Sequence, residues 1–162
     1  KEWSHGTGYD SHKLVKGGPL KLGGLTMDWT EHLEGHSDGD VLLHAIASSI
    51  LGSAGLGDLG GRFPTSDPKY KDYDSALFLT ESSGLIGDLG WEIIHIDATI
   101  IAQQPRLSNY VSPIEKRIKS LLKSKNPSLS VNVKVTSTDG LGTIGKGEGV
   151  ASQSIVTVRQ QK

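Results

Sequence analysis

The segment from Trp91 to Ala102 constrains the fold more than any other part of the sequence. It carries isoleucine at positions 93, 94, 96, 100 and 101, and β-branched residues favour extended backbone, so it predicts the strongest strand of the chain. A helix is expected after Pro113, because its apolar residues Ile114, Ile118, Leu121 and Leu122 share one helical face. The alternating segment Leu129–Val135 then predicts a second strand.

The rest of the chain supplies the other elements, and together they follow the approximate order β-β-α-α-β-α-β-β. The other expected elements are a polar extended segment at 2–9, a strand at Pro19–Met27, a helix from Ser37 or Asp38 to Leu51, a long loop at Gly55–Tyr73, a helix at Asp74–Gly87, a glycine-rich loop at Asp139–Gly149 and a strand at Val150–Val158. This order predicts an α/β fold of α+β-like character, a single mixed β-sheet with helices on one face. The uncovered face of the sheet then needs a partner, which indicates an oligomer.

Composition limits the classes of partner. The 162 residues fit one domain, residues 1–162, and the net charge of −1 gives no reason to expect nucleic acid or a membrane surface. The absence of cysteine excludes disulfides, thiolate metal sites and a cysteine nucleophile. No apolar run is long enough to span a bilayer. The sequence starts without methionine, so an upstream segment or transit peptide stays open.

Two short motifs indicate a metal site. Asp10 and His12 are two residues apart, and on an extended segment such residues point to the same face. His44 lies about one turn inside the expected helix, four residues after Asp40. Two imidazole nitrogens and one carboxylate oxygen make a three-ligand zinc site that keeps a fourth position open, which is the arrangement of catalytic zinc.

Plainer interpretations of these residues stay open at this stage. Asp10 and His12 could be a surface acid and a capping histidine, and Asp38 and Asp40 could be acids favoured at a helix start. The run Gly140–Lys146 resembles a phosphate-binding P-loop, but Gly147 stands where serine or threonine is required and a strand follows instead of a helix.

Two further segments carry groups suited to phosphate. Thr136, Ser137, Thr138 and Asp139 end a strand with three hydroxyls and a carboxylate, which suit phosphate oxygens and a hard cation such as Mg²⁺. The alternative is an ordinary hydrophilic strand end. Arg106 follows the strongest strand, and it is either a surface charge or a phosphate contact, for which guanidinium is well suited.

Taken together, the motifs resemble a known family. The segments that carry the resemblance, in chain order, are Gly8–His12, Gly35–Ala45, Asp58–Gly60, Phe63–Pro68, Ile100–Leu107 and Gly145–Gly149. They are similar to the 2-C-methyl-D-erythritol 2,4-cyclodiphosphate synthase family of the non-mevalonate route to isoprenoids, over essentially the whole chain. The resemblance implies a homotrimer packed through its sheets, with active sites between subunits.

The resemblance also implies a reaction and its cofactors. The 2-phosphate of 4-diphosphocytidyl-2-C-methyl-D-erythritol 2-phosphate would attack the β-phosphorus of the same molecule, giving the 2,4-cyclodiphosphate and CMP. This is phosphorus–oxygen lyase chemistry that needs no protein nucleophile. Zn²⁺ would be held by Asp10, His12 and His44. Mg²⁺ or Mn²⁺ would be held with help from Asp139, and the enzyme would be cytoplasmic in a bacterium, with a plastid-type organelle not excluded.

The resemblance assigns further residues to parts of the substrate. His36 and Ser137 would steady the transferring phosphate. The methylerythritol end would be bound by Ser37, Asp58, Leu59, Gly60, Phe63, Thr65, Ser66 and Asp67. The cytidine and its phosphates would be bound by Ala102, Gln103, Gln104, Pro105, Arg106, Leu107, Ser108, Thr136, Thr138, Thr143 and Lys146. The chain departs from the family where Asp139 replaces a more usual Glu and Ser137 a more usual Thr.

Two rival functions remain open from the sequence. The first is a zinc phosphohydrolase or cyclic phosphodiesterase, in which a zinc-bound water attacks phosphate and is incorporated into the product. The second is a trimer that binds nucleotide diphosphates or senses metal without turnover. The full set of motifs favours the synthase over both.

Overall fold

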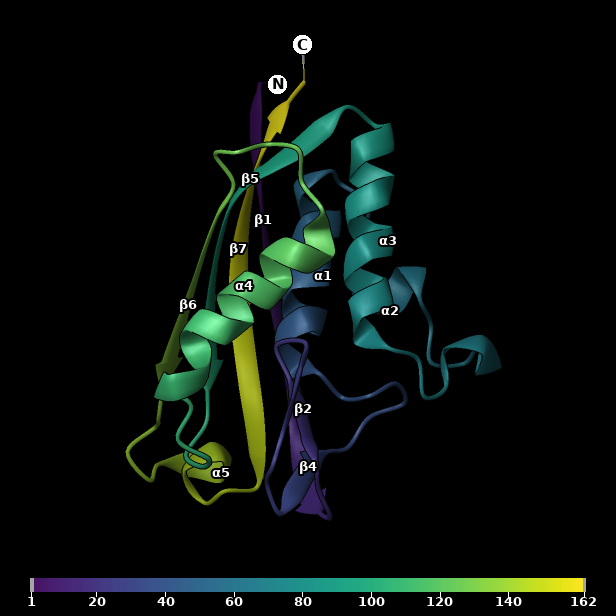
Figure 1. Ribbon diagram of the computed structural model, residues 1–162. Coiled ribbons are helices and arrows are strands. Elements are labelled where there is room, and N and C mark those ends of the chain that lie inside the picture. Colours follow the sequence, from purple (N-terminus) through teal and green to yellow (C-terminus); the bar gives the residue numbers. More distant parts are fainter. Residues whose placement is uncertain (1, 162) are drawn as a thin grey trace.

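The computed structural model describes residues 2–161, which form the strands and helices of Figure 1. The strands are β1 (Trp3–Lys16), β2 (Leu20–Leu22), β3 (Leu25–Met27), β4 (Glu31–Leu33), β5 (Trp91–Ile101), β6 (Ser130–Thr136) and β7 (Gly149–Gln160). The helices are α1 (Val41–Ser53), α2 (Leu59–Arg62), α3 (Ser75–Asp88), α4 (Val111–Leu122) and α5 (Gly142–Gly145), with 3-10 turns at Pro68–Tyr70 and Ser108–Tyr110.

The strands form a mixed sheet, as predicted. Its order is β4-β1-β7-β5-β6; β1 and β5 each pair with β7 in antiparallel register, and β5 pairs with β6 in parallel. The parallel pair needs a crossover connection, which α4 supplies. The prediction of a single sheet was wrong in one respect, because β2 and β3 form a separate two-stranded sheet.

Three helices lie on the same side of the sheet (Figure 1). Helix α1 packs on β1 and β7, α3 packs on α1 and β5, and α4 packs on β6. Helix α1 is buried on almost all sides, which explains why its sequence is apolar around the whole helix rather than along one stripe. In α4, Ile114, Ile118 and Leu122 of the predicted apolar face are buried, whereas Leu121 is only half-buried.

The opposite face of the sheet carries exposed apolar residues. Trp3, Tyr9 and Ile155 are 47%, 64% and 48% exposed. Exposed polar pairs lie on the strands of the sheet as well, such as His5 with Thr157 on β1 and β7, and Asp97 with Lys134 on β5 and β6. This face therefore exposes both apolar and polar side chains.

Several predicted boundaries were wrong for local reasons. Residues 3–9 of the predicted polar segment belong to β1, because β1 pairs with β7 from Trp3 to Lys13. Residues 19–27 form the hairpin of β2 and β3, since Gly23 and Gly24 both adopt positive φ and turn the chain. Helix α1 is capped by Asp40 rather than by Ser37 or Asp38. Among the described residues, no helix has the length and apolar character needed to cross a membrane.

Candidate active site

The predicted metal ligands come together from two elements. Strand β1 presents Asp10 and His12, and the first turn of α1 presents His44. His12 Nε2 lies 2.8 Å from Asp10 Oδ2, and His44 Nδ1 lies 2.9 Å from the same oxygen. The two nitrogens are 3.1 Å apart. One ligand atom from each of the three residues thus points at a common place.

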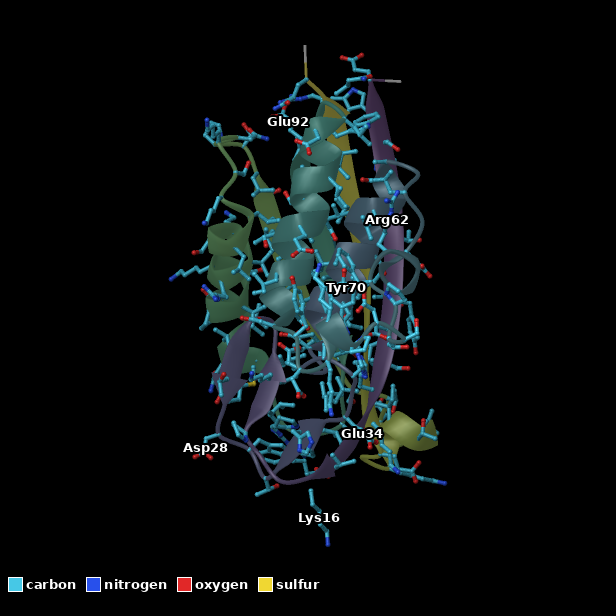
Figure 2. The ribbon with its side chains drawn as sticks, turned by 90° about the vertical axis from the view of Figure 1, so that its right-hand side faces the viewer. Lys16, Asp28, Glu34, Arg62, Tyr70 and Glu92 are labelled. Carbon is cyan, nitrogen blue, oxygen red and sulfur yellow. The ribbon has the colours of Figure 1, made fainter. Side chains whose placement is uncertain are left out.

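The geometry of this cluster fits zinc. A tetrahedral zinc ion with ligands at about 2.0–2.1 Å holds them about 3.3 Å apart, close to the observed separations. A hydrogen bond orients His12 for this role, because its Nδ1 lies 2.7 Å from the carbonyl oxygen of Glu34. Glu34 lies at the same end of the molecule as α5 (Figure 2). A carbonyl only accepts, so Nδ1 carries the hydrogen and Nε2 keeps its lone pair for a cation.

The electrostatics of the cluster also favour a cation. Burial opposes ionisation of Asp10, but hydrogen bonds from His12 and His44 outweigh it and lower the pKa of Asp10 to about 2. Burial likewise opposes protonation of His12, yet the hydrogen bond to Asp10 and the charge of Asp10 raise the pKa of His12 above its usual 6.5. Positive charge is therefore stabilised between these side chains, whether a proton or a metal ion carries it.

A cavity of about 270 Å³ opens beside the cluster. The metal ligands line it, and so does His36, which was predicted to steady the transferring phosphate. Most of the residues predicted for the methylerythritol end line it as well: Ser37, Asp58, Leu59, Gly60, Phe63 and Thr65. The buried Nε2 atom of His36 has no hydrogen-bond partner among the described residues, so it is available to a ligand. The structure thus brings a metal-type cluster and further polar groups to one concave site.

The loop after α1 is held in place by side chains of this cavity. Ser48 Oγ accepts a hydrogen bond from the Leu59 N–H over 3.1 Å, and Asp58 caps the short helix α2 through the Gly61 N–H. Of the residues predicted here, Ser66 and Asp67 do not line the cavity. Asp67 instead caps the 3-10 turn that follows it, where its carboxylate accepts from the Lys69 N–H.

The residues predicted to bind cytidine form a second cavity of about 290 Å³. Residues 102–108 line it together with Thr136 and Ser137. Among residues 2–161, this cavity shares no lining residue with the first. Within one chain, the structure therefore gathers the predicted residues into two separate groups.

Besides Ser66 and Asp67, four predicted residues line neither cavity. Asp139 adopts a positive φ of 52°, beside Ser137, and the Thr138 hydroxyl donates to the Leu141 carbonyl over 2.7 Å. Thr143 lines a third hollow, which it shares with Tyr9 and His12, and Lys146 follows the end of α5.

Sequence reasoning missed several residues of the site. Ser75 contacts His44, and the aromatic side chains of Tyr70 and Phe78 line the first cavity. Tyr70 lies near the middle of the molecule (Figure 2). A single serine at a helix start, or an aromatic residue at an apolar position, carries no sequence pattern that indicates a functional site. Only Tyr9, next to Asp10 in the predicted motif, could have been found by its position.

Comparisons with known proteins agree over the whole chain. The model of the YgbB family matches residues 3–159. The 2-C-methyl-D-erythritol 2,4-cyclodiphosphate synthase of Clostridium acetobutylicum is 51% identical over 150 residues, covering 93% of this chain and 96% of the relative. The synthase of Geobacillus kaustophilus is 44% identical over 155 residues, covering 96% and 97%.

Solved structures show the same fold. The bifunctional IspDF from Campylobacter jejuni superposes with a TM-score of 0.92 at 37% identity, covering 98% of this chain but only 42% of that one. The CDP complex of IspF from Plasmodium falciparum superposes with a TM-score of 0.85 at 30% identity, covering 99% and 98%.

Proposed function

Because the chain belongs to the YgbB family of 2-C-methyl-D-erythritol 2,4-cyclodiphosphate synthases, we propose that its two cavities are the two halves of one active site, completed between neighbouring subunits. The chain has the cyclodiphosphate synthase function of isoprenoid biosynthesis and is a phosphorus–oxygen lyase. Its single domain, residues 1–162, acts on a cytidine diphosphate substrate. A cytoplasmic location, with bacterial relatives, stays a prediction.

The observation that carries the proposal is the convergence of Asp10, His12 and His44 beside a cavity that also holds His36 and Ser37. The three ligand atoms fit Zn²⁺, and the oxygen groups of Asp139 and Ser137 suit Mg²⁺ or Mn²⁺. When bound, a divalent cation acts as a Lewis acid that offsets the negative charge of phosphate oxygens.

The residues of the chain have the task of folding a flexible, charged substrate so that two anions meet. In the reaction, an oxygen of the 2-phosphate forms a bond to the β-phosphorus, and the bond from that phosphorus to the α-phosphate oxygen breaks, so that CMP leaves. Orienting the two groups can lower the barrier by about 7–11 kcal/mol. His36, Ser37 and Asp58 would hold one end of the substrate, and residues 102–108 the cytidine end.

The separation of the two cavities supports an active site shared between subunits of a homotrimer. The metal ligands and residues 102–108 lie in different cavities of one chain, and a neighbouring subunit would bring its own cytidine half to the metal half. The uncovered face of the sheet, with Trp3, Tyr9 and Ile155, is the surface available for packing three copies.

A phosphorus NMR time course on 4-diphosphocytidyl-2-C-methyl-D-erythritol 2-phosphate tests the function. We expect CMP and the cyclic diphosphate to appear in equal amounts. The reaction is run in ¹⁸O-labelled water to separate the synthase from a zinc phosphohydrolase. Intramolecular attack leaves the label out of the product, whereas label in the phosphate would favour hydrolysis. Binding of CDP without turnover of the substrate would favour the non-catalytic rival.

A further inference from the structure

Ser75 lies between a carboxylate and a histidine of the proposed metal site. It is fully buried at the first position of α3, and its Oγ is 2.7 Å from His44 Nε2. The same hydroxyl donates to Oδ1 of Asp38, and the Ser75 N–H donates to Oδ2 of Asp38 over 2.9 Å. Asp38, from the loop before α1, therefore accepts hydrogen bonds from both the backbone N–H and the hydroxyl of Ser75.

The hydrogen-bond inventory decides which nitrogen of His44 carries hydrogen. Both oxygens of Asp38 accept backbone N–H groups, from Asp40 and from Ser75, so this carboxylate acts as an acceptor. The single hydroxyl hydrogen of Ser75 is directed to Asp38, and its oxygen can offer His44 only a lone pair. Nε2 of His44 must then carry the hydrogen of the neutral ring. Nδ1, which donates to Asp10 when the ring is protonated, then offers its lone pair to a metal ion.

We propose that Ser75, held by Asp38, is a positioning residue that fixes His44 in the tautomer whose Nδ1 binds the metal ion. The inference rests on the proposed function only in taking Asp10, His12 and His44 as the metal site. Partners behind a metal-bound histidine fix its ring orientation and raise its basicity. The partner of His12 is the backbone carbonyl of Glu34. The partner of His44 is the buried Ser75, which Asp38 holds in turn.

A second serine near His44 has a different role. Ser37 Oγ lies 3.0 Å from the same Nε2 atom and also lines the first cavity. Since Nε2 carries one hydrogen and the closer Ser75 oxygen accepts it, His44 does not need the hydroxyl hydrogen of Ser37. This hydrogen is available to a phosphate oxygen in the cavity, whereas Ser75, which is fully buried, orients the ring.

Zinc affinity, measured by competition with a chromogenic chelator, tests this role. Ser75→Ala should bind zinc ~10–100-fold more weakly than the wild type. Ser75→Thr, which keeps the hydroxyl, should recover most of the affinity. The matched control is Ser82→Ala in the same helix, since the buried Ser82 hydroxyl has no hydrogen-bond partner among the described residues. Ser82→Ala should bind zinc like the wild type.

A second measurement needs no variant. Long-range ¹H–¹⁵N spectra of the zinc-loaded wild type should show hydrogen on Nε2 of His44 and metal on Nδ1. Metal on Nε2 would overturn the proposal, even if Ser75→Ala does not fold. Unchanged zinc affinity in a folded Ser75→Ala protein would also overturn it and leave the metal site standing. A wild type that binds no zinc would instead remove the metal assignment of the proposed function, and the positioning role with it.

Discussion

Gly8 of β1 lies directly against the backbone of Ala45 in α1. A Cβ atom built on Gly8 would be 2.0 Å from the Ala45 carbonyl oxygen, and one built on Gly6 would be 1.9 Å from the Ser49 carbonyl oxygen. The helix therefore lies on the strand at a distance that only glycine permits. Because His44 precedes Ala45 and Asp10 follows Gly8 by two residues, this contact sets the distance between the metal ligands.

Gly8→Ala should disturb the metal site without touching a ligand. The added methyl must push α1 away from β1, and overpacking of this kind costs about 1–3 kcal/mol of unfolding free energy. Zinc affinity should fall as well, because Asp10 and His44 move apart.

Gly84→Ala is the control. Gly84 lies within α3, and a Cβ atom added there would meet no neighbouring atom, so alanine should stabilise the protein by about 0.5–1 kcal/mol. Denaturant unfolding and zinc competition measure both variants, and a Gly8→Ala protein with unchanged zinc affinity would contradict this account.

His44→Gln should abolish zinc binding and turnover while the fold survives. Two remaining ligands make too weak a site, but glutamine is well tolerated in a helix. Metal content by mass spectrometry and circular dichroism test the two parts. His32→Gln, which changes a histidine outside the cluster, should keep its zinc. Near-normal turnover by a zinc-free His44→Gln protein would refute the metal assignment.

The Asp10–His12 pair should make the zinc-free protein sensitive to pH. The pKa of His12 is raised, so protonated His12 contributes stability at pH values below 6.5, and this stability is lost as the pH rises through the raised pKa. The pKa of Asp10 is lowered to about 2, so its contribution is present above 3.8 and is lost as the pH falls through about 2.

Asp10→Asn removes the charge that raises the pKa of His12. In an NMR titration of the zinc-free variant, the His12 ring should therefore titrate at lower pH than in the zinc-free wild type. The difference in unfolding free energy between the two proteins should shrink as the pH rises through the wild-type pKa of His12. A His12 pKa that does not respond to Asp10→Asn would show that the pair is not coupled.

Asp139→Asn should reduce the response of activity to Mg²⁺ or Mn²⁺ and leave zinc bound. Asparagine tolerates the positive φ of this position, so the change removes charge without straining the backbone. Turnover is measured as a function of magnesium concentration, with zinc content in parallel. If the magnesium dependence equals that of the wild type, Asp139 is not a ligand of the second metal.

Two inactive variants should restore activity to each other if the active site is shared. His12→Ala damages the metal half, and Arg106→Glu should repel the diphosphate from the cytidine half. Each homotrimer should be nearly inactive. In randomly mixed trimers, a site is intact when its metal half comes from an Arg106→Glu subunit and its cytidine half from a His12→Ala subunit. Each condition is met about half of the time, so activity should return to about a quarter of the wild type. No recovery in verified mixed trimers would place the whole site within one subunit.

The sequence by itself determined much of the local structure and pointed to the three residues of the possible metal site. Residue spacing alone placed Asp10 and His12 on one face of an extended segment, and the apolar patterns of Trp91–Ala102 and Ile114–Leu122 predicted β5 and α4. These predictions succeeded because each rests on neighbours a few residues apart, where backbone periodicity dictates which side chains share a face.

The tertiary structure decided what depends on residues distant in the chain. Asp38 looks like a helix cap in the sequence, but it binds Ser75, 37 positions away, and leaves the capping of α1 to Asp40. The sequence could not show this, because several acids near a helix start fit the capping pattern equally well and only packing of α3 against α1 chooses between them. The separation of residues 102–108 from His44 likewise depends on the order of strands in the sheet, which no local pattern encodes.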